Sequence, residues 1–173
     1  REKVAVFSPK GVFIRRWGKL GYNEGEFDLI ETIAIDSKDN VYVGAASKYP
    51  LQKFTTDGTF IKGIGKTSVP FFGRPGRTPG EFYGVKDIAI DSKDNIYVAD
   101  WHNNRVQKFN SDGEFITMWG SDGSAKGEFD GGPISIAVDI EGFVYVGDLR
   151  SGRVQKFTSN GKFITCFSKN GLR

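Results

Sequence analysis

The sequence predicts an all-β fold built from repeated units of four strands. The first indication is a repeat, in which a phenylalanine begins the same short pattern at intervals of 47, 55 and 48 residues. A glycine follows four positions later and a second phenylalanine six positions later. A period of about 50 residues is typical of solenoids and propellers. The four leading phenylalanines are Phe7, Phe54, Phe109 and Phe157.

The second indication is the apolar pattern inside one repeat. Residues 88–91, 96–99, 105–109 and 114–119 are short runs rich in β-branched and aromatic residues, which are typical of strands. Aspartate, asparagine and glycine separate these runs, and these residues favour tight turns. Apolar residues do not recur at helical spacing over the roughly ten positions that a helix needs. Each repeat is therefore predicted to contain four strands and no helix.

Four antiparallel strands in one unit describe a blade of a β-propeller, with strands a to d running outward from the central channel. An aspartate stands eighteen residues before the second, third and fourth leading phenylalanines, but the first has no such counterpart. These aspartates are Asp36, Asp91 and Asp139. The chain should therefore hold three full blades and, at its start, the c and d strands of another.

The predicted boundaries follow from this count. The half blade occupies residues 1–18, and the full blades occupy about 19–65, 66–120 and 121–168, all within a single domain spanning residues 1–173. A propeller ring usually has four to eight blades, so one chain supplies an incomplete ring. Two alternatives remain open: the chain is a piece of a longer propeller, or two copies associate to close a ring.

One stretch of the chain reads Gly80-Glu81-Phe82, Ile88-Ala89-Ile90-Asp91, Asn95-Ile96-Tyr97-Val98-Ala99-Asp100 and Asn103-Asn104-Arg105-Val106-Gln107-Lys108-Phe109. This stretch closely resembles the NHL repeat. Residues 127–167 match well, whereas residues 25–64 keep the strands but depart from the family pattern at residues 45–50. The resemblance implies a propeller of NHL-type blades, and it predicts a rebuilt turn in the second blade.

Composition sets limits on function. The 24 basic and 21 acidic residues give a net charge of +3, which argues against strong non-specific binding of nucleic acid. The chain has no run of about 18 apolar residues, so we expect a soluble chain and no membrane partner. The sequence does not indicate a compartment.

Functional residues are expected on the face formed by the d–a and b–c loops. These loops vary in length and content, as binding loops on a rigid scaffold do, whereas the a–b and c–d turns are nearly uniform. The longest is the d–a loop before the third blade, which carries Phe71, Phe72, Arg74 and Arg77. Aromatic rings and guanidinium groups suit a recognition surface. The alternative is an ordinary long loop whose phenylalanines fold back onto the sheet.

The b–c turns supply the other candidate binding residues, which are Trp101, His102, Arg105 and Arg150. The alternative for Arg105 and its counterpart Arg153 is a structural role, in which they satisfy turn carbonyls and pair with aspartates between blades. In that alternative Asn104 also satisfies turn carbonyls, and the aspartates are Asp100 and Asp148. Trp101, His102 and Arg150 do not repeat, which favours a functional role for them.

Catalysis has little support in the sequence. One histidine and one cysteine do not make a zinc site, and no catalytic triad can be assembled around a single turn histidine. We expect no metal and no cofactor. The aspartates that end the innermost strands suit a cation in the channel, but they equally suit Asx turns.

The sequence therefore predicts a non-catalytic recognition scaffold that binds a protein or peptide through the variable loop face. Single-stranded RNA is the alternative ligand, because the NHL resemblance includes RNA-binding propellers and because arginine with aromatic rings suits phosphate contact and base stacking. A further alternative is part of a propeller lyase or hydrolase whose catalytic residues lie in other blades. Self-association to close the ring is also open.

Overall fold

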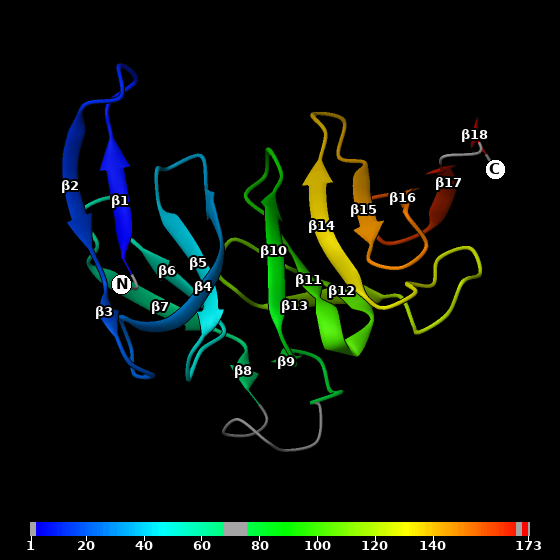
Figure 1. Cartoon of the computed structure of the whole chain (residues 1–173), viewed down its shortest axis with the longest axis horizontal. Helices are drawn as coiled ribbons and strands as arrows, with labels where there is room; N and C mark the ends of the chain where they lie inside the picture. The colour runs from blue at the N-terminus through cyan, green and yellow to red at the C-terminus, as the bar shows by residue number, and fades with distance from the viewer. Residues whose placement is uncertain (1–2, 68–75, 169–170, 173) are drawn as a thin grey trace.

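The computed structural model of the chain describes residues 3–67, 76–168 and 171–172. It shows mainly antiparallel sheets arranged next to one another, each formed by strands that are consecutive in the sequence (Figure 1). The first sheet is the half blade, in which β1 (Val4–Phe7) pairs with β2 (Phe13–Trp17). The all-β fold and the two-strand unit at the start are confirmed.

The second blade has the order β4, β5, β6, β7 from the inside outward. Its strands are β4 (Glu26–Ile35), β5 (Val41–Ala46), β6 (Leu51–Phe54) and β7 (Phe60–Ile64). A short strand, β3 (Lys19–Leu20), pairs in parallel with the beginning of β4.

The third blade follows the same order with β10 (Val85–Ile90), β11 (Ile96–Asp100), β12 (Arg105–Phe109) and β13 (Phe115–Trp119). Its d–a connection contains β8 (Lys66–Thr67) and β9 (Glu81–Phe82), which pair in parallel just as β3 pairs with β4. A 3-10 turn, η1 (Trp101–Asn103), joins β11 to β12.

The fourth blade contains β14 (Pro133–Val138), β15 (Val144–Asp148), β16 (Arg153–Phe157) and β17 (Phe163–Ser168), with β18 (Gly171–Leu172) added at its outer edge. The innermost strand of the third blade, β10, lies between β4 and β14 and contacts both (Figure 1). The innermost strands of the three full blades thus lie next to one another, as they do around the axis of a propeller.

Three hydrophobic clusters fill the spaces between neighbouring blades. Tyr42 and Leu51 of the second blade pack with Ile96 and Phe109 of the third. Tyr97 of the third blade packs in the same way with residues of the fourth, and a further cluster joins the half blade to the second. Because each strand alternates its side chains between two faces, one blade contributes to the clusters on both of its sides.

Two physical reasons explain why glycine occupies the c–d turn of each full blade. Gly58, Gly113 and Gly161 have positive φ angles of 91°, 74° and 83°, a backbone conformation that favours glycine. The last large side chain of the preceding blade also packs directly on each of them. A Cβ atom on Gly58 would lie 2.4 Å from the Trp17 ring, and one on Gly161 would lie 2.5 Å from the Trp119 ring. The repeat spacing therefore encodes contacts between blades.

Candidate binding surface on the third blade

The b–c turn of the third blade places two aromatic side chains at the surface. The η1 turn ends at Asn104, which has a left-handed backbone with φ 51° and donates its N–H to the Trp101 carbonyl. Asparagine tolerates this conformation better than most residues. The turn holds Trp101 and His102 side by side, with ring centroids 3.9 Å apart in a stacked arrangement.

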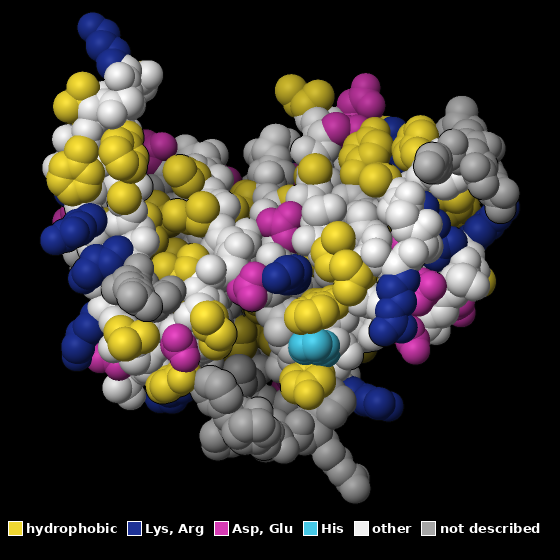
Figure 2. All heavy atoms as spheres, viewed as in Figure 1, with side chains coloured by type: hydrophobic (Ala, Val, Ile, Leu, Met, Phe, Trp, Pro, Cys, Tyr) yellow, Lys and Arg dark blue, Asp and Glu magenta, His cyan; other side chains and the backbone are white. Residues whose placement is uncertain are grey.

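Tyr83 packs against His102 with its ring tilted by 44°. Its ring centroid lies 4.9 Å from that of His102, and 41% of the residue is exposed. Figure 2 shows the histidine side chain at the surface, with hydrophobic side chains directly above and below it in that view. We call Tyr83, His102 and Trp101 the aromatic strip.

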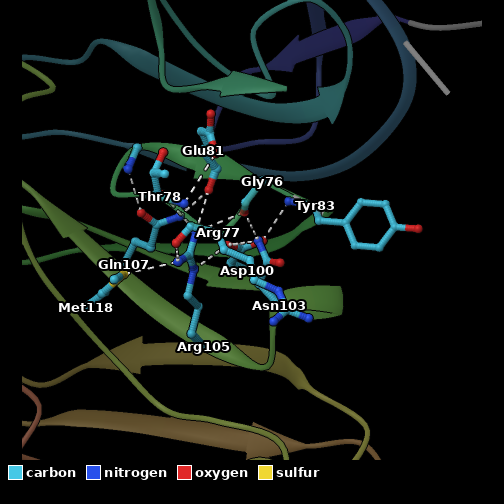
Figure 3. A network of polar contacts seen from close by, with 11 residues as sticks. Gly76, Arg77, Thr78, Glu81, Tyr83, Asp100, Asn103, Arg105, Gln107 and Met118 are labelled. Carbon is cyan, nitrogen blue, oxygen red and sulfur yellow. Dashed lines mark hydrogen bonds and ion pairs between the residues drawn. The ribbon is translucent and has the colours of Figure 1, made fainter. Parts of the chain in front are cut away.

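Backbone contacts fix the strip on the scaffold. The Tyr83 N–H donates to Asp100 Oδ1 at 2.9 Å, and the Tyr83 ring points away from the polar network below it (Figure 3). Trp101 donates its indole N–H to the Gly131 carbonyl at 2.8 Å, which ties the strip to the fourth blade. Tyr83 is therefore bound to Asp100 of its own blade, and Trp101 is bound to the fourth blade.

Two cations flank the strip. Lys86 Nζ lies 5.5 Å from the centroid of the Trp101 ring and 2.6 Å from Glu31 Oε2 of the second blade. Arg150 has a side chain that is 73% exposed, and its nearest carboxylate, Asp130, is 4.0 Å away.

The carbon stem of Arg150 lies over Gly131, where an added Cβ would be 2.8 Å from Cγ of the arginine. Trp101 and Arg150 thus contact the same glycine-rich segment. Desolvation lowers the pKa of His102, and nearby Lys86 lowers it further, while Asp100 opposes both effects.

Arg105 lies beneath this surface in a polar network (Figure 3). It is buried, and its Nε donates to Asp100 Oδ2 at 2.9 Å. Its two terminal nitrogens donate to main-chain carbonyls of the d–a connection, including those of Arg77 and Glu81, both at 2.7 Å. Burial raises the pKa of Asp100, although Arg105 and its other hydrogen-bond donors act in the opposite direction.

The fourth blade repeats this network. Arg153 Nε donates to Asp148 Oδ2 at 3.0 Å, and its terminal nitrogens reach the carbonyls of Ser124, Ala125 and Glu128. The contacts are those of the structural alternative. One detail of that alternative is wrong, because each arginine pairs with the aspartate of its own blade rather than between blades. Antiparallel pairing places Asp100 directly opposite Arg105.

A glutamine on strand c locks the d–a connection in all three full blades. Gln107 accepts the Gly80 N–H at 2.9 Å and donates to the Glu81 carbonyl at 2.8 Å. Gln52 and Gln155 make the same two contacts in the second and fourth blades. Tyr83 of the aromatic strip thus lies in a connection that Arg105 and Gln107 hold by hydrogen bonds, whereas Trp101 and His102 lie in the b–c turn.

The structure brings together some of the predicted binding residues. Trp101 and His102 stack on each other, and Arg150 contacts the same segment as Trp101. Arg77 is exposed at its side chain and supplies its carbonyl to Arg105. Phe71, Phe72 and Arg74 lie outside the described residues. The assignment of these residues to binding stays a prediction.

Sequence reasoning missed Tyr83 and Lys86. A signal for Tyr83 was present, because the corresponding position holds Asp28 in the second blade and Asp130 in the fourth. A side chain that departs from the repeat at one blade is not needed by the fold of every blade. The same criterion had pointed to Trp101 and His102.

The aspartates at the ends of the innermost strands form Asx turns. Asp36 Oδ1 accepts the backbone N–H groups of Lys38 and Asn40, and Asp91 and Asp139 make the corresponding contacts. Within residues 3–67, 76–168 and 171–172, no group of three or more histidine, cysteine or acidic residues is arranged to hold a metal ion. In the same residues, no helix is long and apolar enough to cross a membrane.

Comparisons with known proteins agree with this architecture. No curated protein is significantly similar in sequence to the chain. Among solved structures, a catalytically inactive variant of virginiamycin B lyase from Staphylococcus aureus with quinupristin matches with a TM-score of 0.64 at 13% identity, covering 96% of this chain and 48% of the lyase. A protein of unknown function from Bacteroides caccae matches with a TM-score of 0.62 at 15% identity, over 96% of this chain and 54% of its own.

The WD40 repeats of RRP9 are also similar, with a TM-score of 0.61 at 12% identity over 83% of this chain and 40% of that one. The chain thus spans about half the length of the structures it matches. At these identities the likeness shows the fold alone. Residues 82–109 match the family model of the NHL repeat, and the chain therefore carries an NHL repeat in a fold consistent with the NHL-repeat β-propeller family.

Proposed function

We propose that this propeller scaffold has a non-catalytic role and binds a protein or peptide through the aromatic strip and Arg150. The observation that carries the proposal is the row of exposed Tyr83, exposed His102 and partly exposed Trp101, held by main-chain contacts on two blades. Tyrosine, tryptophan and arginine are the residues that most often dominate the energy of protein interfaces. A fixed surface also loses little conformational entropy on binding.

The contacts of these side chains indicate that they have different roles. One face of Trp101 packs against His102, and its indole N–H is already bound to Gly131. Tyr83, His102 and Arg150 are more exposed and offer a phenol, an imidazole and a guanidinium group. We therefore assign Trp101 as the support of the surface and the other three as its contact groups.

A non-catalytic role is supported by the surroundings of His102. Among the described residues, no side chain forms a hydrogen bond with its imidazole. A histidine that acts as a general base is usually oriented by a hydrogen bond from a third group. His102 is instead positioned by ring stacking, which suits a contact surface.

Charge favours a peptide over RNA. Lys86 pairs with Glu31, and Arg150 faces Asp130, so each cation beside the strip has a carboxylate nearby. These carboxylates weaken the attraction for a phosphate backbone, on which RNA affinity largely depends. A peptide can exploit the rings and the guanidinium group without a high density of negative charge.

A peptide-display selection tests the proposal. Random peptides of twelve residues are selected on the immobilised chain, and the enriched sequences are then measured against a Tyr83→Ser/His102→Ser variant. We expect the variant to lose at least tenfold in affinity, about 1.4 kcal/mol, at an unchanged unfolding midpoint. Ile140→Ser is the control, because Ile140 is 91% exposed in an a–b turn on the opposite loop set.

Equal binding by the strip variant and the wild type would contradict the proposal. A parallel selection with an RNA pool distinguishes the alternative ligand. If RNA is enriched instead and its affinity falls steeply with salt, the surface is a nucleic-acid interface.

A further inference from the structure

A pocket of about 380 Å³ lies between the second and third blades and shares no residue with the aromatic strip. Its aromatic walls include Tyr49 and Phe115, and its glycines are Gly63, Gly65, Gly80 and Gly113. Lys66 and Glu81 also line it. Pockets that hold small molecules typically measure about 300 to 1,000 Å³ and are largely apolar with a few polar groups.

The pocket lies where the second blade departs from the repeat. Tyr49 belongs to the rebuilt b–c turn, and its ring lies directly over Gly63, where an added Cβ would be 2.2 Å from the ring. The corresponding position of strand d holds Met118 in the third blade and Cys166 in the fourth. The glycine and the tyrosine therefore replace the usual side chains together at this one place.

The two charged residues of the pocket differ from an equivalent pair elsewhere in the chain. Lys19 and Glu26 hold the same register in the parallel β3–β4 pair that Lys66 and Glu81 hold in β8–β9. Lys19 Nζ lies 2.7 Å from Glu26 Oε1, which closes that pair. Among the described residues, Lys66 has no ion-pair or hydrogen-bond partner for its ammonium group.

The glutamates themselves are oriented alike. Glu81 Oε2 accepts the Thr78 N–H at 3.3 Å, just as Glu26 Oε2 accepts the Asn23 N–H at 3.2 Å. The second oxygen of Glu26 meets Lys19, whereas the second oxygen of Glu81 has no partner among the described residues. The pocket therefore presents an unpaired cation and an unpaired carboxylate oxygen beside two aromatic rings.

We propose that this pocket binds a free aromatic α-amino acid. Its ring would lie between Tyr49 and Phe115. Its carboxylate would accept from Lys66, and its ammonium group would donate to Glu81. A ligand with only one charge leaves either the lysine or the glutamate unmatched, and a residue inside a peptide has neither charge.

Titration of the ¹⁵N-labelled chain with L-tryptophan, followed by NMR, tests the proposal. We expect saturable shifts at the amides of Gly63, Gly65 and Gly113. L-tryptophan amide, which lacks the carboxylate, and 3-indolepropionate, which lacks the ammonium group, should each bind more weakly. Indole lacks both charges and should bind most weakly of the four.

Variants of the charged residues distinguish a role in ligand binding from a general role in the structure of the blade. Lys66→Gln and Glu81→Gln should each weaken L-tryptophan binding about twofold to fivefold, the size expected of a partly exposed ion pair. Lys19→Gln and Glu26→Gln change the equivalent closed pair and should leave binding unchanged. The proposal is overturned if the three glycine amides do not shift, if indole binds as tightly as L-tryptophan, or if the Lys19 and Lys66 variants behave alike. None of these outcomes bears on the separate proposal that the aromatic strip binds a peptide.

Discussion

Asp100 and Arg105 form a buried ion pair at the base of the third blade, with Arg105 Nε 2.9 Å from Asp100 Oδ2. The side chain of Asp100 is fully buried, and that of Arg105 is 7% exposed. The pair faces the carbonyls of the d–a connection, so it joins strand b, strand c and the connection in one unit. The aromatic strip begins immediately after Asp100 and is therefore built on this pair.

Arg105→Leu should lower the free energy of unfolding by about 3–5 kcal/mol, because the substitution leaves the Asp100 carboxylate buried without its partner. Urea denaturation of the variant measures the loss. Arg150→Leu is the comparison, because this arginine is exposed and should change stability by no more than about 0.5 kcal/mol. Similar small effects of both substitutions would show that the buried pair does not hold the connection.

Gln107→Leu should cost about 1–3 kcal/mol of stability. The leucine keeps the approximate volume but leaves the Gly80 N–H without its acceptor, and an unsatisfied buried donor carries a penalty of that size. The Glu81 carbonyl still accepts from Arg105, which limits the loss. Chemical denaturation provides the measurement.

Gln155→Leu in the fourth blade should give a smaller loss, since Gln155 makes the same two contacts but lacks the hydrogen bond that Gln107 donates to the buried Asp100 carboxylate at 3.1 Å. A neutral result in both blades would mean that the glutamine contacts do not contribute to stability.

Much of the fold could be predicted from the sequence because its signals are local. The glycine at the fourth position after each leading phenylalanine marks a backbone with positive φ, and alternating apolar residues mark the strands. Because the same signals recur in each repeat, every weak signal is supported by its counterparts in the other repeats. The two-strand sheet of β1 and β2 was predictable for the same reason, since only the c and d pattern is present there.

The binding surface could be predicted only in part. Arg105 and Arg150 are both arginines in b–c turns, but one is buried against carbonyls and the other is exposed. Residue type does not distinguish them, because the carbonyl groups that accept hydrogen bonds from Arg105 lie more than twenty residues away in the sequence. Repetition does distinguish them, since Arg105 recurs as Arg153 whereas Arg150 does not recur. The position of Lys86 beside Trp101 depends on the packing of two strands and has no signal in the sequence.

Acid should destabilise the second blade through Asp36. Burial alone would raise the pKa of Asp36, but hydrogen bonds from Asn40 and Lys38 and the nearby Lys53 outweigh it and lower the pKa to about 2. Because the folded state favours the ionised carboxylate, the stabilisation is present above the ordinary pKa of 3.8. It is lost as the pH falls from about 4 to about 2.

The expected stabilisation is roughly 2 kcal/mol, given that the side chain is 1% exposed. Asp36→Asn removes the titrating group, so the variant should be less stable at pH 6 and should lose less stability between pH 4 and pH 2. Urea midpoints across this pH range measure the difference. Parallel curves for the two proteins would assign the acid sensitivity to other carboxylates.

Gly58→Ala should be more destabilising than Gly11→Ala, although both glycines occupy the same position in their c–d turns. Their φ angles are 91° and 75°, so alanine strains the backbone at either site. A Cβ on Gly11 has no atom within 4 Å, whereas one on Gly58 lies 2.4 Å from the Trp17 ring. Gly11→Ala should therefore show the backbone cost alone.

The second cost at Gly58 arises from displacement of Trp17, which packs on Phe54 with ring centroids 4.9 Å apart. Overpacking of a well-filled core typically costs about 1–3 kcal/mol, and this amount should appear as the difference between the two alanine variants. The tryptophan fluorescence spectrum, to which Trp17 contributes together with Trp101 and Trp119, should also shift in Gly58→Ala if the Trp17 ring is displaced toward water. Equal losses in the two variants, with unchanged fluorescence, would mean that the contact between the half blade and the second blade adapts freely, and that the glycine is required by backbone conformation alone.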